Sequence, residues 1–370
     1  MAISVTRPSI RRKDMDSVLT CMVSDQLGPG VRLEEFSSEL SRLLSGSYAV
    51  AVREYTRAIE LAFNAVGLEP GDSIILSPLA PAVYADVLWE RGIIPVFCDV
   101  EAASANLDLE AVENTLARLE ARFGEHAAPD NDEPDPGFPE SKLSRMPKAI
   151  LLDSPLGVPY SLNRLEGLEI PIIEDASHGL GAGENGETIG TLGKFTVLSL
   201  EPDSIFTAGG GAAVVARGRS ERTSLKRAAE SLRTTSLLPD MNASLGLAQL
   251  RALGTYIRRR REVADAFRRS VMQGRHKAPA SGESAVPFAF PVMIDGGAND
   301  VIAYARKKDV EAVWAFSETI MAVADYWEAC ASERFTTASA LLLRCLLFPL
   351  YPTLTNADIE RISKVLTTLP

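Results

Sequence analysis

The sequence predicts an α/β fold with one large domain and a smaller second domain. Short apolar runs that suit buried strands alternate with helix-like segments along most of the chain. The apolar run at 170–173 ends in an acidic pair, Glu174 and Asp175, and the tip of a buried strand is the usual place for a ligand-facing carboxylate in an open α/β sheet. A length of 370 residues, with 46% hydrophobic and 24% charged residues, suits this division.

Glycine and proline residues separate the predicted helices and strands before residue 123. Apolar residues at helical spacing start a helix at Leu33, after a Leu-Gly-Pro-Gly breaker, and Gly67 ends a second helix. Asp99 stands at the tip of a buried strand. We expect strands at 48–52, 73–77 and 93–100, and helices at 33–43, 58–66 and from about 82 to 92.

The region from 123 to 148 is rich in proline and acidic residues, so we expect a mobile surface loop inserted at about 124–147. Further strands are expected at 148–156, 170–175, 195–200, 212–216 and 288–294, and helices at 241–271 and 309–326. The arginine run at 258–261 is expected to form a solvated or interface face. The predicted domains are a large α/β domain at 1–240 and a long helix with a small C-terminal domain at 241–370.

Charge and composition exclude several functions. The net charge of -11 argues against a nucleic-acid-binding or anionic-membrane-binding surface. No run of signal-peptide or membrane-spanning length occurs, so we expect a cytoplasmic protein. The four cysteines are scattered and only three histidines exist, which indicates reduced thiols and no metal site.

Several motifs resemble those of the DegT/StrS-type sugar aminotransferases, a branch of the fold-type I enzymes that use pyridoxal phosphate (PLP). Residues 174–178 read Glu-Asp-Ala-Ser-His, which fits a family motif in full. Residues 28–36 read close to the family's Gly-Pro-x-Val-x-x-Phe-Glu, and Phe-Pro-Leu-Tyr-Pro-Thr-Leu-Thr at 348–355 is similar to the family ending. The resemblance implies a large domain with a mostly parallel mixed sheet between helices, a small α+β C-terminal domain and a twofold homodimer.

The resemblance also implies roles for residues at the strand ends. Asp175 would hold the pyridine nitrogen of PLP, and the family lysine would form the Schiff base. Ser204 takes that lysine's place when 198–200 is aligned on the family's Phe-Ser-Phe, and a hydroxyl cannot form an imine. Neither Lys194, at the opposite end of its strand, nor Lys226, in a following charged helix, is a good replacement.

Other cofactor-binding positions are substituted as well. In the family's phosphate-binding turn, Tyr55 replaces a glycine and only Thr56 survives. Arg57 either binds a phosphate or carboxylate at the helix start, or fills the former pocket or pairs with an acid. Pro81 stands where an aromatic residue would stack on the pyridine ring, and the family's Asn-Tyr-Arg-Met reads Leu-Pro-Asp-Met at 238–241.

Because these losses affect one pocket, the sequence favours a family member that no longer transaminates and serves as a binding or regulatory protein, in sugar-nucleotide or polysaccharide metabolism by family association. One alternative is an aminotransferase or dehydratase of altered mechanism that binds PLP or pyridoxamine phosphate (PMP) without a covalent link. Another is an ordinary aminotransferase whose lysine lies elsewhere. Asp175 could also be structural, paired with an arginine or a backbone N–H.

We expect the protein to bind no cofactor, and the alternative is PLP or PMP bound without a covalent link. Expected partners are a second copy of the chain and a small ligand such as a sugar nucleotide or a phosphate. The candidate site residues are Ser204 at the lysine position and, for cofactor binding, Thr56, Arg57, Asp175, His178 and Ser199.

Overall fold

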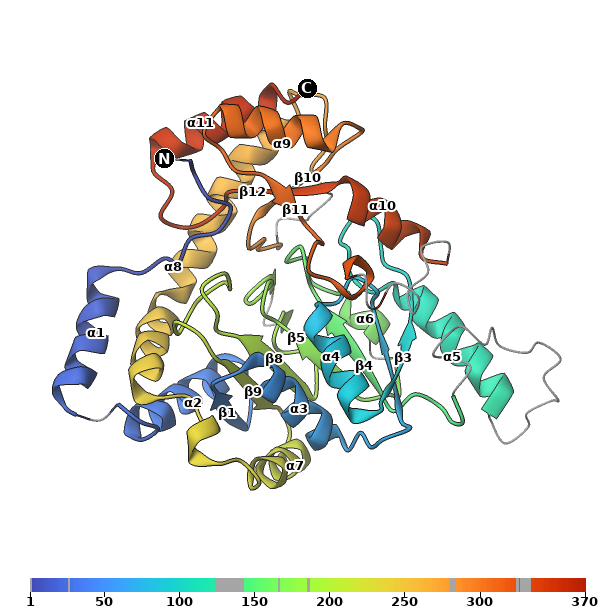
Figure 1. Cartoon of the computed structure of the whole chain (residues 1–370). Helices are drawn as coiled ribbons and strands as arrows, with labels where there is room; N and C mark the ends of the chain where they lie inside the picture. Colours follow the sequence, from blue (N-terminus) through green and yellow to red (C-terminus); the bar gives the residue numbers. More distant parts are fainter. Residues whose placement is uncertain are drawn as a thin grey trace.

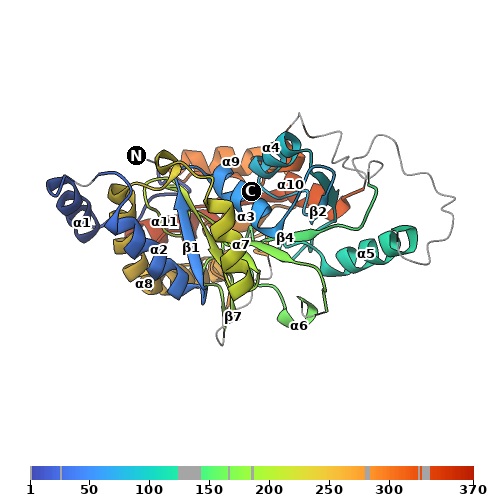
Figure 2. The ribbon, with the colours of Figure 1, turned by 90° about the horizontal axis from the view of Figure 1, so that it is seen from below.

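The structure, a computed structural model, describes residues 2–25, 27–123, 143–165, 167–184, 187–279, 284–323, 326 and 334–370. It places a large α/β domain below a smaller domain in the view of Figure 1, with helices α1 and α5 at opposite ends of the molecule (Figures 1 and 2). Most of the predicted acidic insertion lies outside the described residues. Among the described residues, no helix is both long and apolar enough to cross a membrane.

A seven-stranded sheet forms the centre of the large domain. Its strands are ordered β1-β9-β8-β5-β4-β2-β3. All neighbours from β3 to β8 are parallel, whereas β9 is antiparallel to both β8 and β1. The strands are β1 (Tyr48–Val52), β2 (Ser73–Leu76), β3 (Ile94–Phe97), β4 (Ala149–Asp153), β5 (Ile172–Asp175), β8 (Phe195–Ser199) and β9 (Ala212–Ala216). The predicted mostly parallel mixed sheet is confirmed.

Helices cover both faces of this sheet. Helices α3, α4 and α7 pack on one face, while α2 and α8 cover one end of the other face and α5 covers its opposite end. Side chains of a strand alternate between faces, so Val50 and Val52 join one core whereas Ala49 and Ala51 join the other. The helices are α1 (Arg12–Val23), α2 (Val31–Leu43), α3 (Tyr55–Val66), α4 (Ala82–Arg91), α5 (Leu109–Phe123), α6 (Leu162–Leu165), α7 (Arg219–Ala229) and α8 (Asp240–Val271).

The smaller domain is built on a three-stranded antiparallel sheet with the order β10-β12-β11. Helices α9 and α11 and the second half of α8 pack against it, and Ile3 joins this core from the N-terminus. Helix α10 instead packs on the large domain. The elements are β10 (Phe290–Met293), α9 (Ala298–Lys307), β11 (Val313–Trp314), α10 (Thr336–Arg344), β12 (Cys345–Phe348) and α11 (Asn356–Thr367), with 3-10 turns at Thr234–Ser236 and Ile320–Ala322 and a small hairpin of β6 (Gly183–Glu184) and β7 (Glu187–Thr188).

Two expectations for the second half are wrong. The segment 309–326 is not a helix, because Val313 and Trp314 pair with β12 and complete the small sheet. The arginines at 258–261 are not a uniformly solvated face. Arg260 is only 4% exposed, and its Nη1 donates to the carbonyls of Phe288 (2.6 Å) and Leu350 (2.8 Å), so it ties α8 to two loops of the small domain. Burial lowers the pKa of Arg260 to about 10.

Two buried or strand-end carboxylates act as long-range helix caps. Asp240 is fully buried and accepts the backbone N–H groups of Gly30 (2.7 Å), Arg32 (3.1 Å) and Leu33 (2.9 Å) at the start of α2. Asp99, at the tip of β3, accepts two backbone N–H groups at the start of α10. Each cap satisfies donors that a helix cannot satisfy itself and fixes its position relative to the sheet.

Candidate functional site

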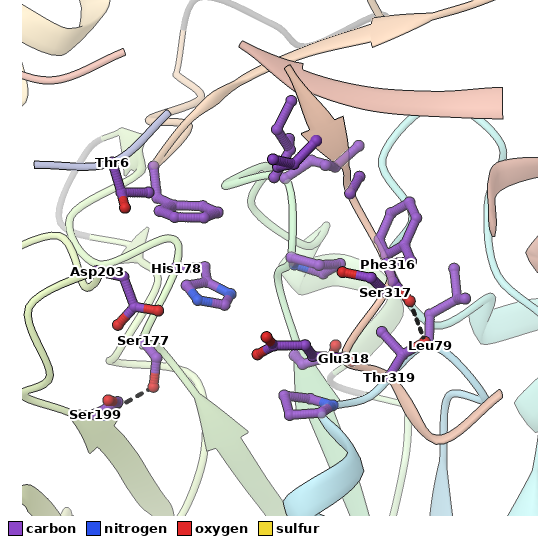
Figure 3. Close-up of a pocket in the computed structure, with 18 of the residues that line it drawn as sticks. Thr6, Leu79, Ser177, His178, Ser199, Asp203, Phe316, Ser317, Glu318 and Thr319 are labelled. Atoms are coloured by element: carbon purple, nitrogen blue, oxygen red, sulfur yellow. Dashed lines mark hydrogen bonds between the residues drawn. The ribbon is translucent and has the colours of Figure 1, made fainter. Parts of the chain in front are cut away.

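The carboxyl ends of β4, β5 and β8 open into a pocket of about 640 Å³ that the segment 311–319 of the smaller domain covers. This edge of a parallel sheet is where α/β proteins usually bind ligands, because strand ends and the loops after them converge there. Figure 3 shows His178 and Asp203 on one side of the pocket and Ser317, Glu318 and Thr319 on the other.

The acidic pair at the end of β5 divides into a structural and a pocket residue. Successive side chains of a strand point to opposite faces. Glu174 therefore turns away from the pocket, is 1% exposed and accepts the backbone N–H groups of Gly190 (2.7 Å), Leu192 (2.8 Å) and Gly193 (3.1 Å). Asp175 lines the pocket.

Two tyrosine hydroxyls occupy one oxygen of Asp175. Tyr84 donates to Oδ2 at 2.7 Å, Tyr55 donates to the same oxygen, and the backbone N–H of Ser177 donates to Oδ1 at 2.9 Å. Burial, and then the charge of Asp175, raises the pKa of both phenols well above the ordinary value. Both tyrosines therefore stay protonated and act as donors. The sequence interpretation that paired Asp175 with an arginine or a backbone N–H is therefore met by the Ser177 N–H, while phenols take the place of the arginine.

A second carboxyl group, Asp153, lies beside Asp175 in the sheet. The two residues are register partners at the ends of β4 and β5. Asp153 is 4% exposed, it lines the pocket, and its Oδ1 has no hydrogen-bond partner. Burial, with the charge of Asp175 as the second cause, raises the pKa of Asp153 to about 7. Near neutral pH this group can therefore hold or release a proton.

His178 stands against an aromatic ring. Its imidazole stacks on Phe288, with ring centroids 4.4 Å apart and an interplanar angle of 18°. The carbonyl of Phe288 is one of the acceptors of Arg260, which holds this loop in place. Burial lowers the pKa of His178, while the negative charges of Asp175, Asp203 and Glu318 oppose that shift. His178 is therefore mainly neutral at neutral pH and can accept or pass a proton inside the pocket.

The loop after β8 contributes two further acids. Ser199 lines the pocket and its backbone N–H donates to Ser177 Oγ at 2.8 Å. Glu201 and Asp203 also line the pocket. Ser204, which the sequence predicts at the lysine position, is 9% exposed, and its N–H closes a turn on the Glu201 carbonyl. Ser204 is not among the residues that line the pocket.

Thr56 and Arg57 lie in the first turn of α3 and do not line the pocket. Arg57 is exposed and forms an ion pair with Glu60 one turn later. This placement agrees with the interpretation in which Arg57 pairs with an acid. Of the candidate residues, the structure thus brings Asp175, His178 and Ser199 together and leaves three outside; their functional roles remain predictions.

The residues present do not fit PLP. The carboxylate oxygen that would meet the pyridine nitrogen already accepts from Tyr55 and Tyr84. Among the described residues that line the pocket there is neither a lysine for an imine nor an arginine for a phosphate. Lys194 is exposed at the far end of β8, and the Lys226 ammonium lies over the ring of Tyr48. The described residues also include no group of three or more His, Cys, Asp or Glu side chains placed to hold a metal ion.

Several residues of this site were not among the candidates from the sequence, and three of them show why. Tyr84 lies in the first turn of α4, and nothing in its sequence neighbourhood signals a functional role. Glu318 comes from a segment that was expected to be helical. Asp153 could have been found from the sequence, because it ends an apolar strand in the same way as Asp175 does.

Comparison with known proteins agrees with this architecture. The spore coat polysaccharide biosynthesis protein SpsC of Bacillus subtilis is 25% identical over 300 residues, covering 72% of this chain and 68% of that protein. GDP-perosamine synthase of Vibrio cholerae is 22% identical over 287 residues, covering 72% and 70%. The structure of PseC from Helicobacter pylori, an aminotransferase involved in the biosynthesis of pseudoaminic acid, superposes with a TM-score of 0.84 at 18% identity and covers 99% of this chain and 98% of PseC.

The pattern of one aminotransferase family matches almost the whole chain, from residue 8 to residue 367. The match includes the strand ends that form the pocket and the small C-terminal domain. The chain therefore belongs to the DegT/DnrJ/EryC1/StrS aminotransferase family.

Proposed function

We propose that this family member does not transaminate and instead binds a small ligand, in a binding or regulatory role. The observation that carries the proposal is the hydrogen bond from Tyr55 to Asp175. Tyr55 stands where the family's phosphate-binding turn has a glycine, and its phenol reaches the carboxylate that would face the pyridine nitrogen. The substitution of this glycine by Tyr55 thus affects both the turn that would bind the PLP phosphate and the carboxylate that would bind the pyridine ring.

The absence of a lysine among the described pocket residues supports the same proposal, because PLP-dependent transamination needs an amine that forms and releases the Schiff base. Ser204 cannot supply one. His178 and Asp153 could still move protons, but without the imine they have no carbanion chemistry to serve.

We place this function in sugar-nucleotide or polysaccharide metabolism. The support comes from proteins of similar sequence: SpsC is named for spore coat polysaccharide biosynthesis, and another similar protein is a GDP-perosamine synthase. The expectation of a cytoplasmic protein remains part of this proposal.

We further propose a homodimer. The support is an apolar surface on α1, on the segment that follows it and on α2, where large side chains are 43% to 84% exposed. Single exposed apolar residues are ordinary, but several of them on neighbouring segments of the chain are typical of an interface. Its members are Met15, Leu19, Met22, Val23, Leu27, Val31 and Leu43. Light scattering at micromolar concentration tests this, and a monomer would contradict it.

The test of the main proposal is a titration with PLP, followed by borohydride reduction and peptide mass spectrometry. We expect no lysine to be labelled in the wild type beyond the background of the Asp175→Asn variant. The variant serves as the control because surface lysines react with PLP equally in both proteins, whereas a true cofactor site needs Asp175. A single lysine labelled only in the wild type would restore the aminotransferase. Calorimetric binding of PMP without labelling would instead favour an enzyme of altered mechanism.

A further inference from the structure

The pocket is lined by carboxyl groups without matching cations. Among the described residues that line it there are six carboxylic acids and no lysine or arginine. They come from four places: the ends of β4 and β5, the loop after β8, and the segment 311–319 of the smaller domain. The acids are Asp153, Asp175, Glu201, Asp203, Glu311 and Glu318.

Half of these acids have partners within the protein. Asp175 holds two phenols and a backbone N–H. Glu201 accepts the N–H of Gly211 at 3.2 Å, and Glu311 accepts the N–H of Val5 at 2.8 Å. These bonds orient the carboxylates, but a neutral donor does not cancel their charge.

Among the described residues, the other three acids each have a carboxyl oxygen without a hydrogen-bond partner. Asp203 and Glu318 are exposed at the rim of the pocket and have no hydrogen-bond or ion-pair partner among the described residues. Asp153 is the decisive case, since it is only 4% exposed and its Oδ1 has no partner, although it lines the pocket. A buried carboxyl oxygen normally finds a donor, and an orphan at a pocket wall indicates that a ligand supplies it.

The sign of the charge on these described residues disfavours phosphate-bearing ligands and favours cations. Carboxylates in a low-dielectric cleft reinforce one another and raise the local concentration of positive ions. A phosphate would enter against this field, whereas an ammonium group donates hydrogen bonds to carboxylates and has no acceptor to satisfy.

The spacing of the acids favours an organic cation over a metal ion. Among the described residues no three acidic or histidine side chains are placed to share one ion. Trp314, Phe316 and the stacked His178 and Phe288 pair also line the pocket, and aromatic rings attract ammonium groups. Unpartnered acids at the pocket wall and on opposite sides of the rim suit several ammonium groups joined by an aliphatic chain (Figure 3).

We propose that the pocket binds a small aliphatic polyamine, a ligand that carries at least two ammonium groups. This inference rests on the proposed function, because a pocket that held PLP would not be free for such a ligand. The polyamine would place one ammonium group near Asp153 and another between Asp203 and Glu318.

The experiment is a calorimetric titration of the full chain with four compounds: spermidine, putrescine, butylamine and 1,4-butanediol. They carry three, two, one and no ammonium groups on similar aliphatic chains. We expect affinity to follow the number of charges, with putrescine at least about tenfold tighter than butylamine, and to weaken as salt is added. Equal affinities, no binding of any compound, or preferential binding of Mg²⁺ would overturn the proposal.

A pair of double variants separates a built site from general attraction to an acidic protein. Asp203→Asn/Glu318→Gln removes two pocket charges that hold no internal bond, so the fold should tolerate it. Glu113→Gln/Glu120→Gln removes two exposed charges on α5, outside the pocket. We expect spermidine affinity to fall at least about tenfold in the first variant and less than about twofold in the second. Equal losses in both would contradict a specific site.

The two proposals fail in different ways. If PLP labels a specific lysine, both fail. If neither PLP nor spermidine binds, the proposed loss of transamination stands and the polyamine inference falls. Spermidine binding without PLP labelling supports both.

Discussion

Two sets of acidic side chains in this molecule differ in the hydrogen-bond donors that surround them. Asp240, Asp99 and Glu174 are packed against backbone N–H groups, and each holds two or three of them from a distant segment. In the pocket, Oδ1 of the buried Asp153 has no hydrogen-bond partner among the described residues, and Glu318 is exposed. A buried carboxyl group thus stabilises the fold in one region, whereas in the other a buried carboxyl oxygen is left without a donor.

The difference indicates where the chain keeps groups for something other than its own stability. A buried carboxylate without donors costs stability, whereas one with several N–H donors can be favourable. Burying the Asp153 carboxyl group therefore lowers the stability of the fold, and this residue lies at the pocket. Four substitutions test this difference, in order of decreasing effect on stability.

Asp240→Ala is expected to have the largest effect on stability. It leaves three N–H groups at the start of α2 without their acceptor at a position with no solvent contact. We expect the free energy of unfolding to fall by about 4 kcal/mol. Urea unfolding measures it, with Asp203→Ala as the control, for which we expect a change within about 0.5 kcal/mol. Similar losses in both variants would remove the distinction between the two sets.

Asp153→Asn is expected to stabilise the protein at pH 8. The pKa of Asp153 is raised to about 7, so its stability contribution is intact at low pH and is lost as pH rises from its unfolded value toward 7. Asparagine cannot ionise and should recover on the order of 3 kcal/mol at pH 8, with little change at pH 4. Unfolding curves across this range measure it.

The groups that face Asp153 have to be considered in this pH dependence. They are Asp175 on the neighbouring strand, which raises the pKa of Asp153, and the phenol of Tyr160, which donates to the Asp153 backbone carbonyl. His178 also titrates, with its pKa lowered by burial. A wild type and an Asp153→Asn variant with parallel stability profiles would contradict the assignment.

Tyr55→Phe is expected to lower the free energy of unfolding by about 1 to 2 kcal/mol, because a hydrogen bond to a charged acceptor is lost while Tyr84 and the Ser177 N–H remain on Asp175. The raised pKa of Tyr55 adds a second signature: the wild type should lose stability as pH rises above about 10, where unfolded tyrosines ionise, and the variant should lose less. A variant as stable as the wild type at pH 7 would show that the bond contributes nothing.

Glu318→Gln is expected to have the smallest effect. Glu318 is exposed and has no partner among the described residues, so the free energy of unfolding should stay within about 0.5 kcal/mol of the wild type. Thermal unfolding measures it. A loss above about 1 kcal/mol would mean that Glu318 has a structural role and belongs with the first set.

Much of the fold could be predicted because its signals are local. The apolar runs at 48–52, 73–77 and 195–200 are strands, and Gly67 and Gly92 end helices in the left-handed conformation that glycine adopts readily. The segment 309–326 was mistaken because its short strand exists only through pairing with Leu346 and Leu347 of β12, a contact that no local pattern encodes.

The site was only partly predictable for the same reason. Asp175 could be predicted because it ends a strand and belongs to a motif. The hydrogen bonds of Tyr55 and Tyr84 to its carboxylate, however, depend on how α3 and α4 pack over the sheet. Ser204 at the family's lysine position is a prediction from the sequence alone. That Ser204 also lies away from the pocket lining depends on the turn it closes with Glu201.

The most direct test of the central claim is a crystal structure of the protein grown with an excess of PMP. We expect Tyr55 and Tyr84 to remain hydrogen-bonded to Asp175 Oδ2 and no pyridine ring to lie at this carboxylate. A pyridine nitrogen within hydrogen-bond distance of Asp175, with Tyr55 displaced, would contradict it.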